Sequence, residues 1–194
     1  MKTNIVLILV FVFLSSMSCE EKHNAKPQDQ FVKVGNEIVW STNAFGFELL
    51  KKLEPADSES GNELISPVSI QLSLGMTYNG AREETRDSMK QALRFQGLSD
   101  EEINQGAQNL MQLLSRDLSA IDIKPANSIW YREEYTVEPG FLQTNKNFYQ
   151  AEIRPVDFNN NNTLDTINNW VNQKTGGNIP EIIDRIQPND FMIL

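Results

Sequence analysis

The sequence predicts one α+β domain in which helices outnumber strands. Of its 194 residues, 40% are hydrophobic and 22% are charged, which is ordinary for a folded protein and too apolar for a disordered chain. From Ser41 onward, short segments with helical or strand periodicity follow one another closely, without an internal repeat or a Pro/Gly-rich linker. We therefore expect a single folded unit over residues 41–194.

The first helix is predicted over Thr42–Leu53. Phe45, Leu49 and Leu53 recur at a spacing of four, which places them on one face of a helix. A polar loop beginning around Pro55 follows, because a helix usually ends at or before the residue preceding a proline. The segment is therefore interpreted as an amphipathic helix.

Two signals compete in the next segment, residues 66–78. Ser66 and Pro67 indicate a helix start, because a serine hydroxyl caps the first turn and the missing N–H of proline costs nothing there. The following residues alternate between apolar and small or polar side chains, which by pattern alone would indicate a strand. We favour a helix that is buried on most faces, and we expect Asn79-Gly80 to end it in a left-handed turn.

Two more helices are expected before residue 115. Glu83–Phe95 carries Met89 and Leu93 four residues apart, and Ser99 with Glu102 forms a capping box that opens the next helix. That helix has an apolar stripe that we expect to be buried: Ile103, Ala107, Leu110 and Leu114.

The remaining segments are predicted to alternate between strands and helices. Ile121–Tyr131 and Glu152–Phe158 have strand-like composition, although Pro125 indicates a bulge or an edge position. A helix is expected after Pro139, with these residues on one face: Phe141, Leu142, Phe148 and Tyr149. Another helix is expected from an N-cap at Thr163 through Thr175, closed by Gly176-Gly177, with Leu164, Ile167 and Val171 on one side.

Charge and the scarcity of histidine and cysteine exclude several functions. A formal net charge of −9 provides no basic face for nucleic acid. The only cysteine, Cys19, and the only histidine, His23, both precede the predicted domain. Catalytic sites of the Ser/His/Asp or Cys/His type and His/Cys metal sites are therefore excluded from it. An extracytoplasmic hydrolase and a metal site are therefore not expected.

Adjacent carboxylates offer a weaker enzymatic alternative, the acid and base of a glycosidase. Pairs such as Glu83-Glu84 and Glu133-Glu134 are neighbours in sequence, so on a helix their side chains diverge by about 100°. We interpret them as solvated faces.

Residues 1–18 are predicted to be a secretion signal. Ile5–Leu14 is an unbroken apolar run that is shorter than the roughly 20 residues of a membrane-spanning helix. Small residues then precede Cys19, which is similar to a bacterial lipoprotein signal, although Ser16 stands where such signals usually carry leucine. We expect Cys19 to become the lipidated first residue of the mature chain. Ordinary cleavage next to an incidental cysteine is the alternative.

In this interpretation residues 19–40 connect a membrane to the domain, and the polar stretch that contains His23 is a tether. The protein is then expected to be exported, either as an outer-membrane or cell-surface lipoprotein or as a secreted, extracellular protein.

Several segments in register carry a resemblance to a known family. The most specific runs from Asn62 to Thr85 (NELISPVSIQLSLGMTYNGAREET). Further segments support it: Ala126–Trp130, Phe141 with Tyr149, Val156–Phe158, Ile167–Val171, and Thr175 with Gly176 and Ile179. In this order they resemble the N-terminal half of a serpin, a serine protease inhibitor, from about Phe45 to the last residue.

The resemblance implies a mechanism without a cofactor. In serpins a protease cleaves an exposed loop near the C-terminus, and that loop inserts into the main sheet as an extra strand while the attached protease is distorted. By resemblance, Ser66, Pro67 and Ser69 lie under the main sheet in the region that opens, where hydroxyls would satisfy sheet groups. The helix that would move aside over the main sheet is identified by Ile167, Asn168, Trp170 and Thr175.

The chain departs from the family at Phe191–Leu194, where the resemblance implies that it is entering a central strand. The remaining strands and the reactive loop with its reactive centre would be absent, so we expect an N-terminal fragment. The full protein is expected to inhibit serine or cysteine proteases. The alternative is a non-inhibitory surface lipoprotein that uses a serpin-like scaffold for binding.

Overall fold

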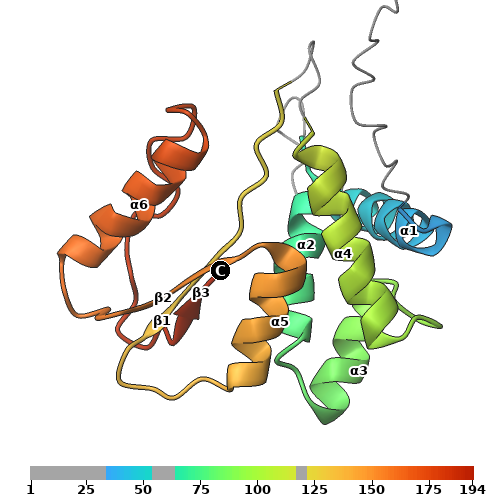
Figure 1. The fold of residues 1–194 in the computed structure, drawn as a ribbon, viewed down its shortest axis with the longest axis horizontal. Helices are drawn as coiled ribbons and strands as arrows, with labels where there is room; N and C mark the ends of the chain where they lie inside the picture. The colour runs from blue at the N-terminus through green and yellow to red at the C-terminus, as the bar shows by residue number, and fades with distance from the viewer. Residues whose placement is uncertain (1–33, 54–63, 117–121) are drawn as a thin grey trace, which may run out of the picture. The chain divides into compact units, whose positions relative to one another are not determined.

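Figure 1 shows the fold in a computed structural model, which describes residues 34–53, 64–116 and 122–194. The signal, Cys19, His23 and the tether lie outside these ranges. The described elements are α1 (Asn36–Leu53), α2 (Pro67–Tyr78), α3 (Glu83–Ala92), α4 (Asp100–Leu114), β1 (Ser128–Arg132), α5 (Pro139–Tyr149), β2 (Glu152–Val156), α6 (Asn162–Lys174) and β3 (Met192–Ile193).

Helix α1 begins at Asn36, earlier than the predicted Thr42. The extra turns are held by tertiary packing: Ile38 is buried, and a Cβ added at Gly106 of α4 would clash with its side chain. The close approach of α1 to α4 therefore fixes a start that the sequence pattern does not reveal.

Residues 67–78 form a helix, which confirms the prediction from the cap. The Ser69 amide donates to the Ser66 hydroxyl (3.4 Å), and Pro67 occupies the first turn. One small residue of the alternating pattern, Gly75, lies where α5 comes close. A Cβ at Gly75 would lie 2.8 Å from the Tyr149 hydroxyl of α5.

The expected left-handed turn at Asn79-Gly80 is wrong. Asn79 has φ −61° and ψ −24°, which is right-handed helical backbone, and its amide donates to Gly75 O (3.2 Å). The Asn79 side chain instead bonds to other helices, and that tertiary role explains the residue type.

Helix α4 confirms the predicted capping box. The Glu102 amide donates to the Ser99 hydroxyl (3.2 Å), and the Ser99 amide donates to the Glu102 carboxylate (2.7 Å). In the predicted stripe, Ile103 and Ala107 are buried, whereas Leu110 and Leu114 are only half-buried. Met111 is the buried residue in the last turns of the helix.

Both predicted strands are shorter than expected. Residues 122–127 have no strand pairing, so β1 begins at Ser128 rather than Ile121, and β2 ends at Val156. Pro125 accounts for part of this, because proline cannot donate to a strand ladder. The described sheet has the order β2-β1-β3, with β1 parallel to β2 and antiparallel to β3.

Helix α6 does not begin with a Thr163 cap. Its N-cap is Asn161, and the Thr163 hydroxyl donates back to Asp157 O (2.6 Å) from within the first turn. The predicted end is confirmed: Gly176 and Gly177 have φ of +62° and +89°, a backbone conformation that favours glycine.

Candidate functional site

The sheet is packed on both faces, and the alternation along β1 sets which residue faces which layer. Ile129 is fully buried in a cluster with residues of α2, α4 and α5, whereas Trp130 packs with residues of α6. In β3, Met192 contacts the helical cluster and Ile193 the α6 cluster. Figure 1 shows α6 and the other helices on opposite sides of the strands. The sheet with α6 is the candidate site.

An aromatic pair joins α6 to the sheet. Trp130 and Trp170 meet edge to face with ring centroids 6.1 Å apart, and Ile167 and Val171 pack in the same cluster. The favourable quadrupole geometry adds to the burial of two large rings. The predicted residues Ile167 and Trp170 therefore both face the sheet.

A polar cluster around Glu152 supplements this pair. The Glu152 carboxylate accepts from the Trp170 indole N–H (2.9 Å) and from Arg154 (3.1 Å), and it forms an ion pair with Lys174. The Lys174 ammonium, followed by the Trp170 N–H, holds the pKa of Glu152 below its ordinary value. These bonds fasten the C-terminal turns of α6 to the first residue of β2.

Asn168, also predicted, binds the segment that returns from α6 to β3, which we call the crossing segment (residues 175–191). Its amide nitrogen donates to Ile183 O (2.9 Å), and its amide oxygen accepts from the N–H groups of Ile182 (3.0 Å) and Ile183 (3.1 Å). Thr175 begins the same segment, and its hydroxyl accepts from the Ile179 amide (3.0 Å). Side chains on or next to α6 thus hold the crossing segment by its backbone.

The structure places the other predicted residues at the start of α2. The hydroxyls of Ser66 and Ser69 are exposed and hydrogen-bond to each other (2.9 Å), while Pro67 is half-buried. They form a local cap and are not grouped with the α6 residues. Their role beneath an opening sheet stays a prediction.

A buried asparagine cluster was not predicted. The Asn79 amide nitrogen donates to the side-chain oxygens of Asn104 (3.0 Å) and Asn145 (3.1 Å), and Asn145 is fully buried. The three residues join α2, α4 and α5 under the sheet. Satisfied amide clusters of this kind specify one packing arrangement, because an unpaired member would be costly.

A second unpredicted contact joins α2 to α4. The Tyr78 hydroxyl donates to Asp100 (2.8 Å), and Arg86 forms an ion pair with the same carboxylate. Burial, and then the bond to Asp100, raises the pKa of Tyr78 to about 12. The partners in this contact lie far apart in the sequence, so no local pattern predicts it.

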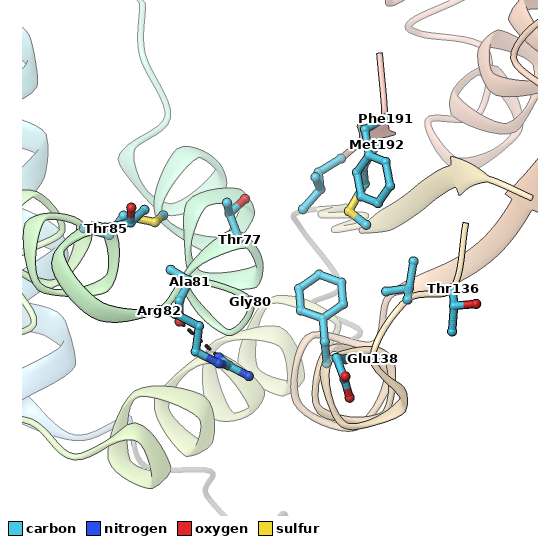
Figure 2. Close-up of a pocket in the computed structure, with 13 residues that line it drawn as sticks. Thr77, Gly80, Ala81, Arg82, Thr85, Thr136, Glu138, Phe191 and Met192 are labelled. Atoms are coloured by element: carbon cyan, nitrogen blue, oxygen red, sulfur yellow. Dashed lines mark hydrogen bonds between the residues drawn. The ribbon is translucent and has the colours of Figure 1, made fainter. Parts of the chain in front are cut away.

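An apolar recess opens beside β3. Its volume is about 510 Å³, and it lies between the α2–α3 turn, the start of α5 and the end of β3. Figure 2 shows Phe191 and Met192 on one side and Thr77, Gly80 and Ala81 on the other. Arg82 at the rim donates to Ala81 O (3.0 Å). This lining suits the packing of apolar side chains better than acid-base chemistry.

In residues 34–53, 64–116 and 122–194, no three His, Cys, Asp or Glu side chains gather closely enough to hold a metal ion. None of the helices in these ranges combines the length and apolar composition that crossing a membrane requires.

A helical layer, a mixed three-stranded sheet and one helix over the opposite face define an α+β fold in the described residues. The sequence profile of the family described as serpin (serine protease inhibitor) matches residues 41–194. The chain belongs to the serpin family.

Relatives and solved structures agree with this assignment. A serpin-like protein of Thermococcus kodakarensis is 32% identical over 84% of this chain and 38% of its own length. The leukocyte elastase inhibitor of Bos taurus is 37% identical over 64% of this chain and 33% of its own. The thermophilic serpin tengpin in its latent state matches with a TM-score of 0.71 and 34% identity, over 82% of this chain and 42% of that structure.

The chain thus spans about two fifths of the length of the serpins that it matches. The serpins it matches include protease inhibitors, and the resemblance assigns the chain no catalytic residue. The described fold, with six helices and a partial mixed sheet, corresponds to the N-terminal portion of such a protein.

Proposed function

We propose that this chain is the N-terminal part of a protease inhibitor that traps serine or cysteine proteases by inserting its cleaved reactive loop into the sheet. One observation carries the proposal. Residues 41–194 match the serpin family, and the described strands β1, β2 and β3 form a mixed sheet, the kind of element to which a strand can be added.

The attachment of α6 supports the same mechanism. Strands β1 and β3 share backbone hydrogen bonds, such as Arg132 N to Phe191 O (3.2 Å). Helix α6 is held on the sheet by side chains, chiefly Trp170 on Trp130 and the bonds to Glu152. Side-chain contacts can break and re-form without dismantling the sheet, so the helix can shift while the strands stay paired.

The name of one relative supports a protease as the partner class. The bovine relative is a leukocyte elastase inhibitor, which makes protease inhibition a reasonable proposal for the complete form of this protein. The choice between serine and cysteine proteases would depend on a reactive loop that is not part of this sequence.

Export and lipid anchoring belong to the same proposal. An apolar run followed by small residues and Cys19 is what supports them. Metabolic labelling with a tritiated fatty acid tests the anchor: the label should appear on the wild-type chain and be absent from Cys19→Ala. Equal labelling of both chains would contradict it.

The inhibitory function is tested on the complete protein. We would incubate it with a panel of serine and cysteine proteases and look for a complex that survives SDS. The same proteases with chemically blocked nucleophiles are the matched control, because a covalent trap requires an active nucleophile. A stable complex with at least one active protease is expected. If no protease in a broad panel gives one, the inhibitory proposal fails and a non-inhibitory binding scaffold remains.

A further inference from the structure

Arg132, the last residue of β1, is a buried cation whose function neither the sequence nor the resemblance assigns. Its side chain is only 8% exposed. A buried charge is costly unless hydrogen bonds and opposite charges compensate for it. The partners of the guanidinium therefore indicate what the residue does.

Its shortest bonds go to backbone carbonyls of the crossing segment. Nε donates to Asp190 O (2.6 Å), and a terminal nitrogen donates to Pro188 O (2.6 Å). The other terminal nitrogen lies 3.2 Å from the carboxylate of Glu134, which is about half exposed. The guanidinium carbon lies 5.4 Å from the centre of the Phe158 ring. A planar guanidinium can serve two carbonyls at once, whereas an ammonium is a single point of charge.

The residues that Arg132 binds form a turn that closes on itself. The Gln187 amide donates to the Asp190 carboxylate (2.7 Å), and the Asp190 amide donates to Gln187 O (3.0 Å). The next carbonyl, that of Phe191, accepts from the Arg132 amide (3.2 Å) and opens the pairing of β1 with β3. Arg132 therefore binds the turn with its side chain and the start of β3 with its backbone.

We infer that Arg132 is a positioning residue that keeps β3 docked on β1 and fixes their register. Side-chain bonds from the last residue of β1 to the residues immediately before β3 fix how the two strands align. A guanidinium that binds the carbonyls of both Pro188 and Asp190 in a closed turn favours a single register.

The consequence for trapping rests on the proposed function. When Arg132 anchors β3, an incoming loop does not separate β1, β3 and the crossing segment from one another, and they move together. The new strand then enters on the far side of β3 from β1 and not between β1 and β3. Without the anchor, the β1–β3 pairing becomes a competing opening, and insertion at the correct edge slows.

The anchor itself is tested on this chain by hydrogen exchange with mass spectrometry. In Arg132→Gln, amides in peptides covering 187–193 should exchange about tenfold faster or more, because the turn and ladder open locally. Arg132→Lys keeps the charge but cannot bridge both carbonyls, so it should resemble Arg132→Gln. The matched control is Arg185→Gln, an exposed arginine in the same segment, which should change exchange there by less than about twofold.

Peptides from α2 serve as an internal reference for global unfolding. Unchanged exchange at 187–193 in Arg132→Gln, or an equal change in Arg185→Gln, would overturn the inference. If peptides 187–193 exchange as slowly in Arg132→Lys as in the wild type, the inference is also overturned, because a positive charge alone would then be enough to hold the turn. If Arg132→Gln also speeds exchange in the α2 peptides, global unfolding accounts for its effect. The exchange of peptides 187–193 in Arg132→Lys then decides the role of Arg132 by the same criteria.

The functional consequence is measured on the complete protein as the ratio of trapped protease to cleaved, released inhibitor. Arg132→Lys should shift this ratio severalfold toward cleavage, a readout that loss of stability alone would not predict. If peptides 187–193 exchange faster but the ratio of trapped protease to cleaved inhibitor is unchanged, the proposed effect of Arg132 on loop insertion is overturned. If the wild-type protein traps no protease, the proposed function fails, while the exchange result still decides the role of Arg132.

Discussion

Asn168 on α6 provides the sharpest test of how the crossing segment is held. Replacing it with alanine removes three hydrogen bonds to the backbone of Ile182 and Ile183. Each such bond contributes about 0.5–1.5 kcal/mol net. Ile182 is 58% exposed, so water replaces part of the loss, and alanine regains roughly 0.5 kcal/mol of helix propensity. We expect Asn168→Ala to lower the free energy of unfolding by about 2 kcal/mol.

The assay is urea unfolding followed by tryptophan fluorescence, because Trp130 and Trp170 lie in the cluster that should loosen first. Asn169→Ala is the matched control: it is the next residue of the same helix, exposed, and it gains the same helix propensity. The difference between the two variants isolates the hydrogen bonds. If Asn168→Ala and Asn169→Ala unfold at the same urea concentration, the proposed clamp on the crossing segment is refuted.

Three further predictions concern packing, pH and association. Gly75→Ala should destabilise the chain by about 1–3 kcal/mol in the same urea assay, because the added Cβ would meet the Tyr149 hydroxyl at 2.8 Å; a neutral result would contradict the close approach. The folded-state pKa of Glu152 lies below its ordinary value of 4.5, so its stabilising effect is complete above that pH and is lost as the pH falls through the folded pKa. Thermal unfolding of Glu152→Gln should therefore depend less on pH in this acidic range than the wild type does, and identical profiles would show that the Lys174 pair is inconsequential. The chain of residues 1–194 should associate during size-exclusion chromatography, because Phe191 and Leu194 are exposed beside an unpaired strand edge; a monodisperse monomer would show that this edge is protected.

Local signals predicted the helices well where a cap or closing glycine was present. The Ser66-Pro67 start, the Ser99 capping box and the Gly176-Gly177 end depend on neighbours in sequence, and the structure confirms all three. Errors arose where distant contacts decide. The early start of α1 depends on Ile38 packing against Gly106, which no local pattern reveals.

Some residues of the candidate site were predicted from the sequence and others were not. Ile167, Asn168 and Trp170 were identified through a family resemblance, and the structure gives each a contact with the sheet or the crossing segment. Arg132 was missed because its partners are backbone carbonyls more than fifty residues away. The Asn79 cluster was missed because an asparagine before a glycine also fits a helix end.

The central claim is that the sheet of the complete protein accepts the cleaved reactive loop as an additional strand. Its most direct test is the thermal unfolding of the complete protein before and after a protease cleaves its reactive loop. An inserted strand would bury apolar surface and add backbone hydrogen bonds to the sheet, contributing several kcal/mol and raising the unfolding temperature by on the order of 10 °C. An unfolding temperature that stays the same or falls after cleavage would contradict insertion and, with it, this account of the sheet.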